Sequence, residues 1–407
     1  MRRILRLVIL IALGWPSHAD DARLEALRST LIGMRGTHSG PGAPRGATPQ
    51  LTVAKHQLRD WVESRLTALT LRGDEGEFER KLNSELREGG LTCGDERSPM
   101  RQPCPDWILA GYLGDVQVRR RAVFLTVQTA FGIECGYDES VYLYSWSGEG
   151  WRRVWETEQN TYTEKEYTPQ TIHAVLVSPY SKANDYVVLT LGSQPWCSSN
   201  WHQVYYRVFR LGPDIQARPL VDGTQSAYLG AHDPPIQGSV ALNDVLVEFT
   251  VGSIDGGVHS REAIRHYRID RDEVKRIDPL ALSPRDFVDE WLTHVWKEAV
   301  FWSESPNRRS MREWHQRLHK GLISGEFIYP TMHCPKTPDL WQVGVDFSDP
   351  PTPIGEKPKG TYFLLRWRPP YTFRMVEISD HPWPNCTEED RNADDEPRTL
   401  FPVQEWR

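Results

Sequence analysis

The feature that most constrains the fold is a repeat of short apolar strands in the middle of the chain. Three strongly apolar segments begin at Val123, Val187 and Val245, which gives spacings of 64 and 58 residues. Each is preceded by a weaker segment and followed by a loop, a Tyr-rich segment and a last short segment. Segments of this kind, rich in β-branched and aromatic residues, are typical of β-strands. The sequence therefore predicts three four-stranded antiparallel units in tandem.

The predicted strands occupy corresponding places in the three units. They are 111–118, 123–127, 141–144 and 151–155 in the first unit, 174–178, 187–191, 204–208 and 217–221 in the second, and 238–242, 245–249, 264–269 and 274–277 in the third. A fourth sheet is expected from 362–367 paired with 373–378.

Tandem units of this kind resemble the blades of a β-propeller. The resemblance is incomplete, because three blades do not close the usual ring of about four to eight, and no blade signature such as Trp-Asp recurs. The alternative is an irregular β-sandwich in which the spacing is a coincidence. The predicted fold class is mainly β with α: propeller-like units, preceded by a helical hairpin and followed by a small α+β region.

Helical patterns precede the β-units. Leucines at helical spacing predict a short helix over 21–34, and a Gly- and Pro-rich flexible linker follows over 35–50. A second helix is expected over about 53–71 and a third around Phe78, ending at Gly89-Gly90, so that the two form a hairpin. The basic run Arg119-Arg120-Arg121 is expected to be a solvated turn in the first β-hairpin.

Helical signals return after the third unit. Ser283 followed by Pro284 predicts a helix start, and the apolar residues from Phe287 to Ala299 predict one helix with a broad buried face. Ser310-Met311-Arg312-Glu313 has the form of a capping box and predicts the start of a second helix, which ends at Gly321.

These patterns divide the chain into six parts. They are a signal peptide (1–19), a short helix and flexible linker (20–50), a helical hairpin and Cys loop (51–106), a β-repeat domain (107–280), an α+β region (281–380) and an acidic, solvated tail (381–407).

The N-terminal segment has the layout of a secretory signal peptide. Arginines at positions 2, 3 and 6 precede an apolar run over 7–13, and Ser17-His18-Ala19 supplies small residues at the positions that a signal peptidase recognises. A membrane anchor is the alternative, but the run is far shorter than the roughly 20 apolar residues that a spanning helix needs. We therefore expect cleavage after Ala19, no membrane span in the mature chain, and an extracytoplasmic location, either periplasmic or secreted.

Composition narrows the possible partners. The hydrophobic fraction of 39% and the charged fraction of 25% are typical of a globular protein. The formal net charge of −7 becomes −10 when the three arginines of the signal peptide are removed. A nucleic-acid partner would favour a clustered basic face, so the expected partner is an unknown small molecule, glycan or protein. The sequence contains no motif that predicts a cofactor.

The six cysteines favour disulfides, because an even number in an exported chain is typical of disulfide bonding. No Cys-x-x-Cys spacing occurs, so a zinc ribbon or thioredoxin-type motif is not supported. Proximity in a polar loop predicts one pair, and corresponding loops of the first two β-units predict another; the third follows by elimination. The expected pairs are Cys93–Cys104, Cys135–Cys197 and Cys334–Cys386.

The β-repeat also predicts where a binding site would lie. The loops expected at 128–140, 192–203 and 252–262 occupy corresponding positions, so they should gather at one end of the β-domain, and loops on a rigid scaffold often carry binding residues. Aromatic and charged residues of these loops would form a polar site with aromatic walls. The simpler interpretation is that they pair with one another and brace the loops. The candidate ligand-binding residues are Trp196, Trp201, His202, Asp255, His259 and Arg261.

Three kinds of chemistry are conceivable for residues of these types. Glu134, Asp138 and Asp255 could supply the two carboxyl groups of a glycoside hydrolase, which lie about 5–9.5 Å apart. A serine hydrolase is disfavoured, since no Gly-x-Ser-x-Gly motif occurs. His315 and His319 have a spacing that can bind a metal, with His333 as a third ligand, but Gln316 stands where the protease motif requires Glu. A solvated polar row is the simpler interpretation of that histidine pair.

Two functional hypotheses follow. The first is an exported binding or interaction protein whose ligand is unknown, and it depends on the signal peptide, the repeat and the aromatic residues. The second is a secreted carbohydrate-active hydrolase, which depends on the carboxylates and Trp residues of the loops. The sequence does not decide whether the protein is an enzyme.

Overall fold

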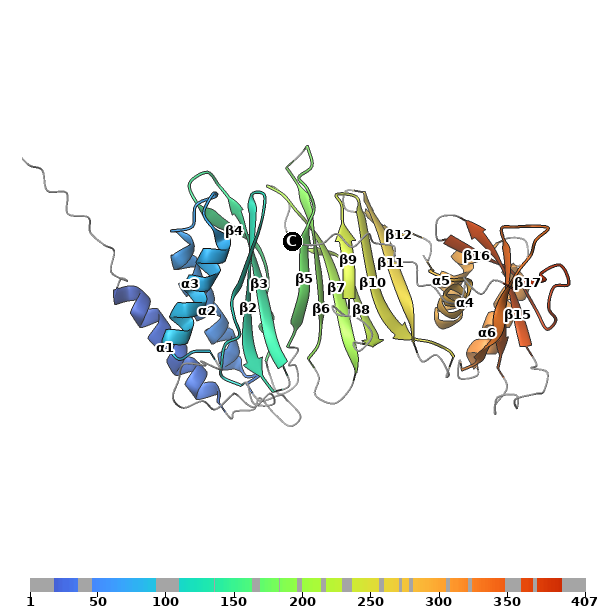
Figure 1. Ribbon diagram of the computed structural model, residues 1–407, viewed down its shortest axis with the longest axis horizontal. Coiled ribbons are helices and arrows are strands. Elements are labelled where there is room, and N and C mark those ends of the chain that lie inside the picture. The colour runs from blue at the N-terminus through green and yellow to red at the C-terminus, as the bar shows by residue number, and fades with distance from the viewer. Residues whose placement is uncertain are drawn as a thin grey trace, which may run out of the picture. The chain divides into compact units, whose positions relative to one another are not determined.

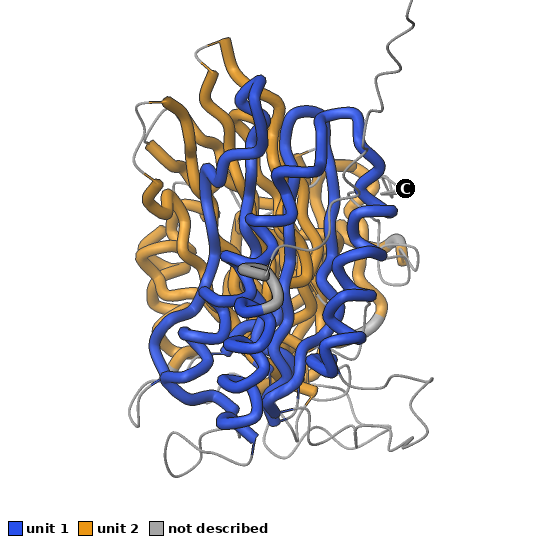
Figure 2. Tube along the Cα trace, turned by 90° about the vertical axis from the view of Figure 1, so that its left-hand side faces the viewer, with its two compact units in different colours: residues 1–171, 195–197 blue, residues 172–194, 198–407 orange. Residues whose placement is uncertain are grey.

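The structure is a computed structural model. It forms two compact units, Met1–Thr171 with Pro195–Cys197 and Ile172–Gln194 with Ser198–Arg407, which we call unit 1 and unit 2 (Figure 2). The residues that the structure describes are 18–35, 46–92, 110–134, 136–162, 169–182, 184–195, 200–213, 217–228, 236–255, 260–270, 273–277, 281–304, 308–320, 324–347, 360–368 and 372–389.

Three helices cover one face of the first sheet in unit 1 (Figure 1). They are α1 (His18–Met34), α2 (Pro49–Leu66) and α3 (Glu75–Glu88). Asp74 caps α3 by accepting a hydrogen bond from the backbone N–H of Glu77. Gly90, with a φ of 67°, ends it, and the Leu91 N–H donates to the Leu86 carbonyl in the manner of a Schellman motif. The predicted Gly89-Gly90 terminus is therefore confirmed.

The sheet of unit 1 has the strand order β1-β2-β3-β4 and is antiparallel. Its strands are β1 (Gln117–Arg121), β2 (Phe124–Ile133), β3 (Gly136–Trp146) and β4 (Trp151–Thr157). The prediction of a solvated turn for the basic run was wrong, because Arg119 and Arg120 lie in β1 and bind α3. Arg119 pairs with Glu79 at 2.9 Å and Arg120 with Glu75 at 2.6 Å. The first strand was predicted at 111–118, which is too early, because the basic run that was predicted to form a turn is part of β1 (Gln117–Arg121).

Unit 2 begins with two further four-stranded antiparallel sheets, β5-β6-β7-β8 and β12-β11-β10-β9. Apolar side chains of the two sheets form one core, and Leu189 and Leu191 of β6 lie against Gly238 of β9. Their strands are β5 (Thr171–Val177), β6 (Tyr186–Ser193), β7 (Trp201–Leu211), β8 (Pro219–Tyr228), β9 (Ile236–Val240), β10 (Asp244–Gly252), β11 (Ser260–Asp270) and β12 (Glu273–Arg276).

The three predicted four-stranded units are thus confirmed, and no closed propeller is detected among the described residues. The predicted loops, however, were too long. β2 and β3 leave only residues 134–135 between them, and residues 194–200 and 253–259 separate the other two strand pairs. The second and third strands continue past their apolar centres, because Gly and polar residues at their ends still pair across the sheet.

The C-terminal part of unit 2 packs helices onto a five-stranded sheet of order β16-β15-β14-β13-β17. The predicted pairing of 362–367 with 373–378 is confirmed by β15 and β16. A disulfide joins Cys334 to Cys386, as predicted. The elements are α4 (Pro284–Thr293), α5 (Trp296–Ala299), the 3₁₀ helix η1 (Val300–Trp302), α6 (Arg308–Lys320), β13 (Glu326–His333), β14 (Leu340–Asp346), β15 (Gly360–Arg368), β16 (Thr372–Ser379) and β17 (Glu388–Glu389).

Two predictions about these helices were wrong. The expected single helix is interrupted after Thr293, where His294 adopts an extended backbone conformation, and Val295 is 59% exposed rather than buried. Ser310 does not cap α6, because the helix already begins at Arg308. The predicted Ser283 cap is correct, since its hydroxyl oxygen accepts a hydrogen bond from the Asp286 N–H.

Within the described ranges, no helix is both long enough and apolar enough to cross a membrane. The other two predicted disulfides involve Cys93, Cys104, Cys135 and Cys197, which lie outside the described residues. The Cys135–Cys197 pairing stays a prediction, and one observation favours it. A Cβ atom at Gly136 would lie 3.4 Å from the Cβ atom of Pro195, so residues flanking the two cysteines approach each other.

Candidate functional site

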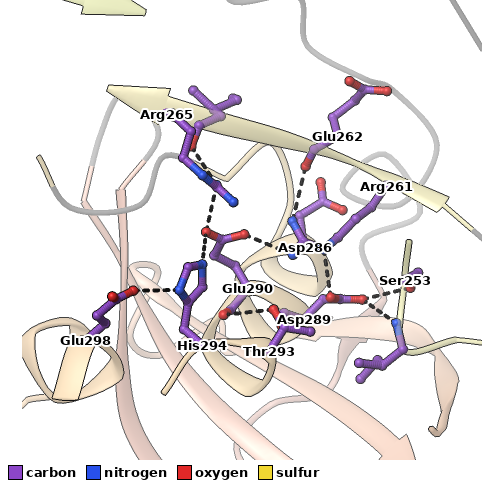
Figure 3. Close-up of polar contacts among 12 residues, drawn as sticks. Ser253, Arg261, Glu262, Arg265, Asp286, Asp289, Glu290, Thr293, His294 and Glu298 are labelled. Atoms are coloured by element: carbon purple, nitrogen blue, oxygen red, sulfur yellow. Dashed lines mark hydrogen bonds and ion pairs between the residues drawn. The ribbon is translucent and has the colours of Figure 1, made fainter. Parts of the chain in front are cut away.

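A buried network of acids and arginines connects strand β11 to helix α4 in unit 2 (Figure 3). Residues spaced four apart lie on one face of a strand, so Arg261 and Arg265 of β11 point in the same direction. Asp289 and Glu290 stand side by side on α4 and are 0% and 2% exposed. A buried charge requires a partner of opposite sign, and each of these groups has one.

Glu290 is the centre of this network. Its carboxylate is 2.9 Å from Nη2 of Arg261, 2.7 Å from Nη1 of Arg265 and 2.8 Å from Nη2 of Arg276 on β12. Burial by itself would raise the pKa of this carboxyl, but Arg265 and Arg261 hold the pKa well below its usual value. Glu290 is therefore an ionised group whose oxygens are occupied by protein donors.

His294 extends the network at the end of α4. Its Nε2 atom is 2.7 Å from Oε1 of Glu290, and its Nδ1 atom is 2.7 Å from Oε2 of Glu298 (Figure 3). Contacts with two carboxylates on opposite sides of one imidazole use both ring nitrogens of His294. His294 therefore joins Glu290 to Glu298.

Asp289 joins the loop after β10 to the same helix. Its Oδ2 atom accepts hydrogen bonds from the Ser253 hydroxyl and the Ile254 N–H, both at 2.8 Å (Figure 3). Its Oδ1 atom lies 2.7 Å from Nε of Arg261. One carboxylate thus fixes both ends of the connection between β10 and β11.

Two residues predicted to bind ligand take part in these contacts. Arg261 pairs with the two α4 acids, and the Asp289 and Glu290 charges raise its pKa although burial opposes this effect. Asp255 is 4% exposed, and its Oδ2 atom accepts a hydrogen bond from the Phe327 N–H at 3.0 Å. Asp255 also forms a β-bridge with Gly325, so it attaches this loop to the β13 region.

Trp201 lies in a different environment at the start of β7. Its side chain is among the exposed large hydrophobics, at 38%, and its ring centroid is 5.3 Å from that of Tyr228 on β8. A Cβ atom at Gly252 would lie 3.6 Å from the edge of the indole. The indole therefore lies within van der Waals distance of the end of β10. We call Trp201, Tyr228 and Gly252 the aromatic platform.

Of the other predicted ligand-binding residues, one lies among the described residues and two do not. His202 lies beside Trp201 in sequence, and its Nδ1 atom is 3.0 Å from the Gln194 carbonyl oxygen. Trp196 and His259 lie outside the described residues. The structure therefore brings Trp201 to the end of β10, while Asp255 and Arg261 face the β13 region and α4 respectively.

Asp138, one of the carboxylates that could serve hydrolysis, is buried in unit 1. It is 0% exposed and lies 3.0 Å from Nζ of Lys55, which is also fully buried. Lys55 donates to Tyr162 Oη at 2.5 Å and to the Gln159 carbonyl at 2.9 Å, and the Tyr162 hydroxyl donates to Asp138. The Gln170 N–H also donates to Asp138, so this carboxylate is fully engaged in holding unit 1 together.

The histidine pair on α6 has a structural arrangement. The Nε2 atoms of His315 and His319 are 2.9 and 3.0 Å from the same His294 carbonyl oxygen. Burial and the neighbouring His319 lower the pKa of His315 to about 4, so the ring is neutral at neutral pH. Among the residues that the structure describes, no group of three or more His, Cys, Asp or Glu side chains is arranged to hold a metal ion.

Comparisons with known proteins add little to this geometry. No protein-family model matches the sequence, and no curated protein matches it. A solved structure of a BT0996–RGII complex is 8% identical, with 62% of this chain and 70% of that chain covered and a TM-score of 0.23. A solved structure of a glycoside hydrolase is also 8% identical over the same shares, with a TM-score of 0.21. Similarity this distant supports no argument about function.

Sequence reasoning missed the partners of the predicted residues. Asp289 and Glu290 share α4 with the buried Phe287, Val288 and Trp291, and acids among buried apolar positions of a helix are a signal for a buried ion pair. Lys55 gave the same signal, since it lies in the buried stripe of α2 between Leu51 and Leu58.

Proposed function

We propose that the protein is an extracytoplasmic binding or interaction protein, and that its ligand contacts the aromatic platform. The observation that carries the proposal is the contrast between exposed Trp201 and the buried carboxylates. An exposed indole that is backed by a second ring offers a rigid, amphipathic contact surface. The flat apolar face of a sugar ring or of a peptide side chain would fit such a surface.

The hydrolase alternative has less support from the described residues. Glycoside hydrolysis needs one carboxyl group that can donate a proton and a second that can reach the sugar or a water molecule. Asp138 and Asp255 are buried and bound to protein donors. Glu134 is partly exposed, but one accessible carboxylate does not supply the pair.

The extracytoplasmic location is part of the same proposal. It is supported by the signal-peptide pattern at residues 1–19 and by the Cys334–Cys386 disulfide. Disulfides persist in oxidising compartments and are rare in the cytosol. Terminal sequencing of native protein should return Asp20, whereas a terminus at Met1 would contradict export.

Affinity electrophoresis tests the binding proposal. Wild-type protein and Trp201→Ala are run through gels that each contain one soluble polysaccharide, xylan, mannan or pectin. Tyr180→Ala is the matched control, because Tyr180 is 41% exposed and packs against Tyr186, and it precedes β6 at the opposite end from Trp201. We expect retardation of the wild type and the control, loss of retardation in Trp201→Ala, and no release of reducing sugar.

Two results would count against this proposal. Release of reducing sugar by the wild type would favour the hydrolase. Retardation that is the same in Trp201→Ala as in the wild type would place the binding surface elsewhere.

A further inference from the structure

Helix α6 presents a cationic surface in an acidic chain. Arg308, Arg309, Arg312 and Arg317 are exposed, and Glu313 is the one acid of this helix. The whole chain has a formal net charge of −7, so this helix departs from the average sign of the protein. We call the four arginines the α6 basic face.

One side of α6 is fixed by the core of unit 2. Met311 is 1% and His315 2% exposed, and Trp314 and Leu318 pack against the same core. Side chains three and four apart share one side of a helix, so Met311, His315 and Leu318 form the anchored side. Arg308 and Arg312 lie at its margin, and all four arginines are nevertheless exposed. The guanidinium of Arg317 stacks 3.5 Å above the Trp314 ring, which holds it at the edge of the face.

The arginine donors are largely unused by the protein. Arg309 has an exposed pairing with Glu313 at 3.4 Å, and exposed pairs of this kind contribute little energy. Arg308 and Arg312 have no ion-pair partner within the described part of the chain. A planar guanidinium binds phosphate oxygens through two parallel hydrogen bonds, so the unsatisfied groups suit a phosphate-bearing partner.

Two exposed apolar side chains lie on segments that are connected to α6 through α5. Phe301 of η1 is 67% exposed and Val295, just before α5, is 59% exposed. The carbonyl of His294, the neighbour of Val295, accepts hydrogen bonds from both α6 histidines, and α5 contacts both α6 and η1. Apolar residues beside arginines are typical of proteins that bind a membrane interface, whereas a soluble polyanion would need only the charges.

We propose that the α6 basic face binds the surface of an anionic phospholipid bilayer. The arginines would contact the phosphate groups, and Phe301 and Val295 would enter the headgroup region. Clusters of four or more Lys or Arg on an amphipathic helix attract anionic lipid, and each cation contributes about 1 kcal/mol near the surface. The interaction is peripheral and separate from ligand binding at the aromatic platform.

Vesicle co-sedimentation of the full chain tests this proposal. We expect binding to vesicles of equal parts phosphatidylglycerol and phosphatidylcholine, and none to pure phosphatidylcholine. The triple variant Arg308→Gln/Arg309→Gln/Arg312→Gln should lower the partition coefficient roughly a hundredfold, and Arg312→Gln alone roughly fivefold. Phe301→Ser should weaken the binding that remains at high salt, where charge interactions are screened.

A matched triple variant controls for net charge. Arg119, Arg152 and Arg368 have exposed side chains, at 68%, 72% and 57%, and their replacement by Gln should leave vesicle binding unchanged. Equal loss in the two triple variants would overturn the proposal, as would equal binding to pure phosphatidylcholine. Retention of heparin in the absence of vesicle binding would overturn it in favour of a soluble polyanion. Far-UV circular dichroism checks that each variant is folded.

Discussion

Unit 1 and unit 2 each bury a charge network where a helix meets a sheet, but the charges are reversed. In unit 1 the helix α2 supplies the cation Lys55, and strand β3 supplies the carboxylate Asp138. In unit 2 the helix α4 supplies carboxylates such as Glu290, and strand β11 supplies arginines such as Arg265. β3 and β11 are both the third strand of a four-stranded unit. The shared feature is therefore the strand position and not the sign of the charge.

The two networks also differ in how many partners the central charge has. Lys55 has one carboxylate, Asp138, within 4.0 Å among the described residues. In unit 2 Glu290 contacts Arg261, Arg265 and Arg276 as well as His294, and Asp289 and Glu298 add negative charge. A network with several partners should tolerate the loss of one charge better than an isolated pair does.

The largest loss in the free energy of unfolding is expected for Asp138→Asn. This change leaves the buried Lys55 ammonium without a carboxylate, and such a loss destabilises proteins by about 3–5 kcal/mol. Urea unfolding of wild type and variant measures the difference. If the free energy of unfolding fell by less than about 1 kcal/mol, the comparison between the two networks would be wrong, since the unit 1 pair would then contribute no more than a surface ion pair.

Glu290→Gln should have a smaller effect. The amide oxygen still accepts hydrogen bonds, Asp289 still pairs with Arg261, and Glu298 remains near Arg276. Of the described arginines, only Arg265 loses its carboxylate partner, so we expect a loss of about 2 kcal/mol. Urea unfolding under the same conditions gives the value. If Glu290→Gln lowered the free energy of unfolding more than Asp138→Asn, the argument that a network with several partners tolerates the loss of one charge would be incorrect.

Asp286 makes the stability of unit 2 depend on pH. Burial raises the pKa of its carboxyl to about 6, although Arg261 opposes this shift. A raised pKa means that the protonated carboxyl is favoured in the folded state, so its contribution is complete below about pH 4 and is lost as the pH rises through about 6. The free energy of unfolding of the wild type should therefore fall by up to about 3 kcal/mol relative to that of Asp286→Asn between pH 4 and pH 8.

Urea unfolding of both proteins across this pH range measures the effect. Parallel curves for wild type and Asp286→Asn would show that the Asp286 carboxyl does not titrate abnormally. The contrast between unit 2 and unit 1 would then be one of partner number alone.

Much of the fold could be predicted from the sequence because each strand has an apolar centre. Val187 and Val245 begin the apolar segments of β6 and β10. A run of apolar residues in the sequence indicates which part of a strand is buried. The strand ends could not be predicted in this way, since Gly136 and Gly252 pair across the sheet without an apolar side chain. The break at His294 was missed because Trp296 continues the helical spacing of apolar residues on the other side.

The candidate site was predicted less completely. Asp255 and Arg261 were predicted as ligand-binding residues, but their partners Phe327 and Asp289 are distant in sequence and come close only through tertiary packing. The sequence pattern gives no signal for which of two distant charged residues will pair. The exposed position of Trp201 likewise depends on the neighbouring strands β8 and β10.

The neutral double variant Lys55→Met/Asp138→Asn tests most directly whether the buried carboxylates are structural. The amide that replaces the Asp138 carboxyl would still accept the hydrogen bond from the Gln170 N–H, and the variant leaves no buried charge at this position. The account predicts that unfolding free energy recovers by about 1–3 kcal/mol relative to Asp138→Asn, and that retardation in polysaccharide gels equals that of the wild type. A double variant that is folded and as stable as the wild type but shows no retardation would contradict a purely structural role for the buried carboxylate.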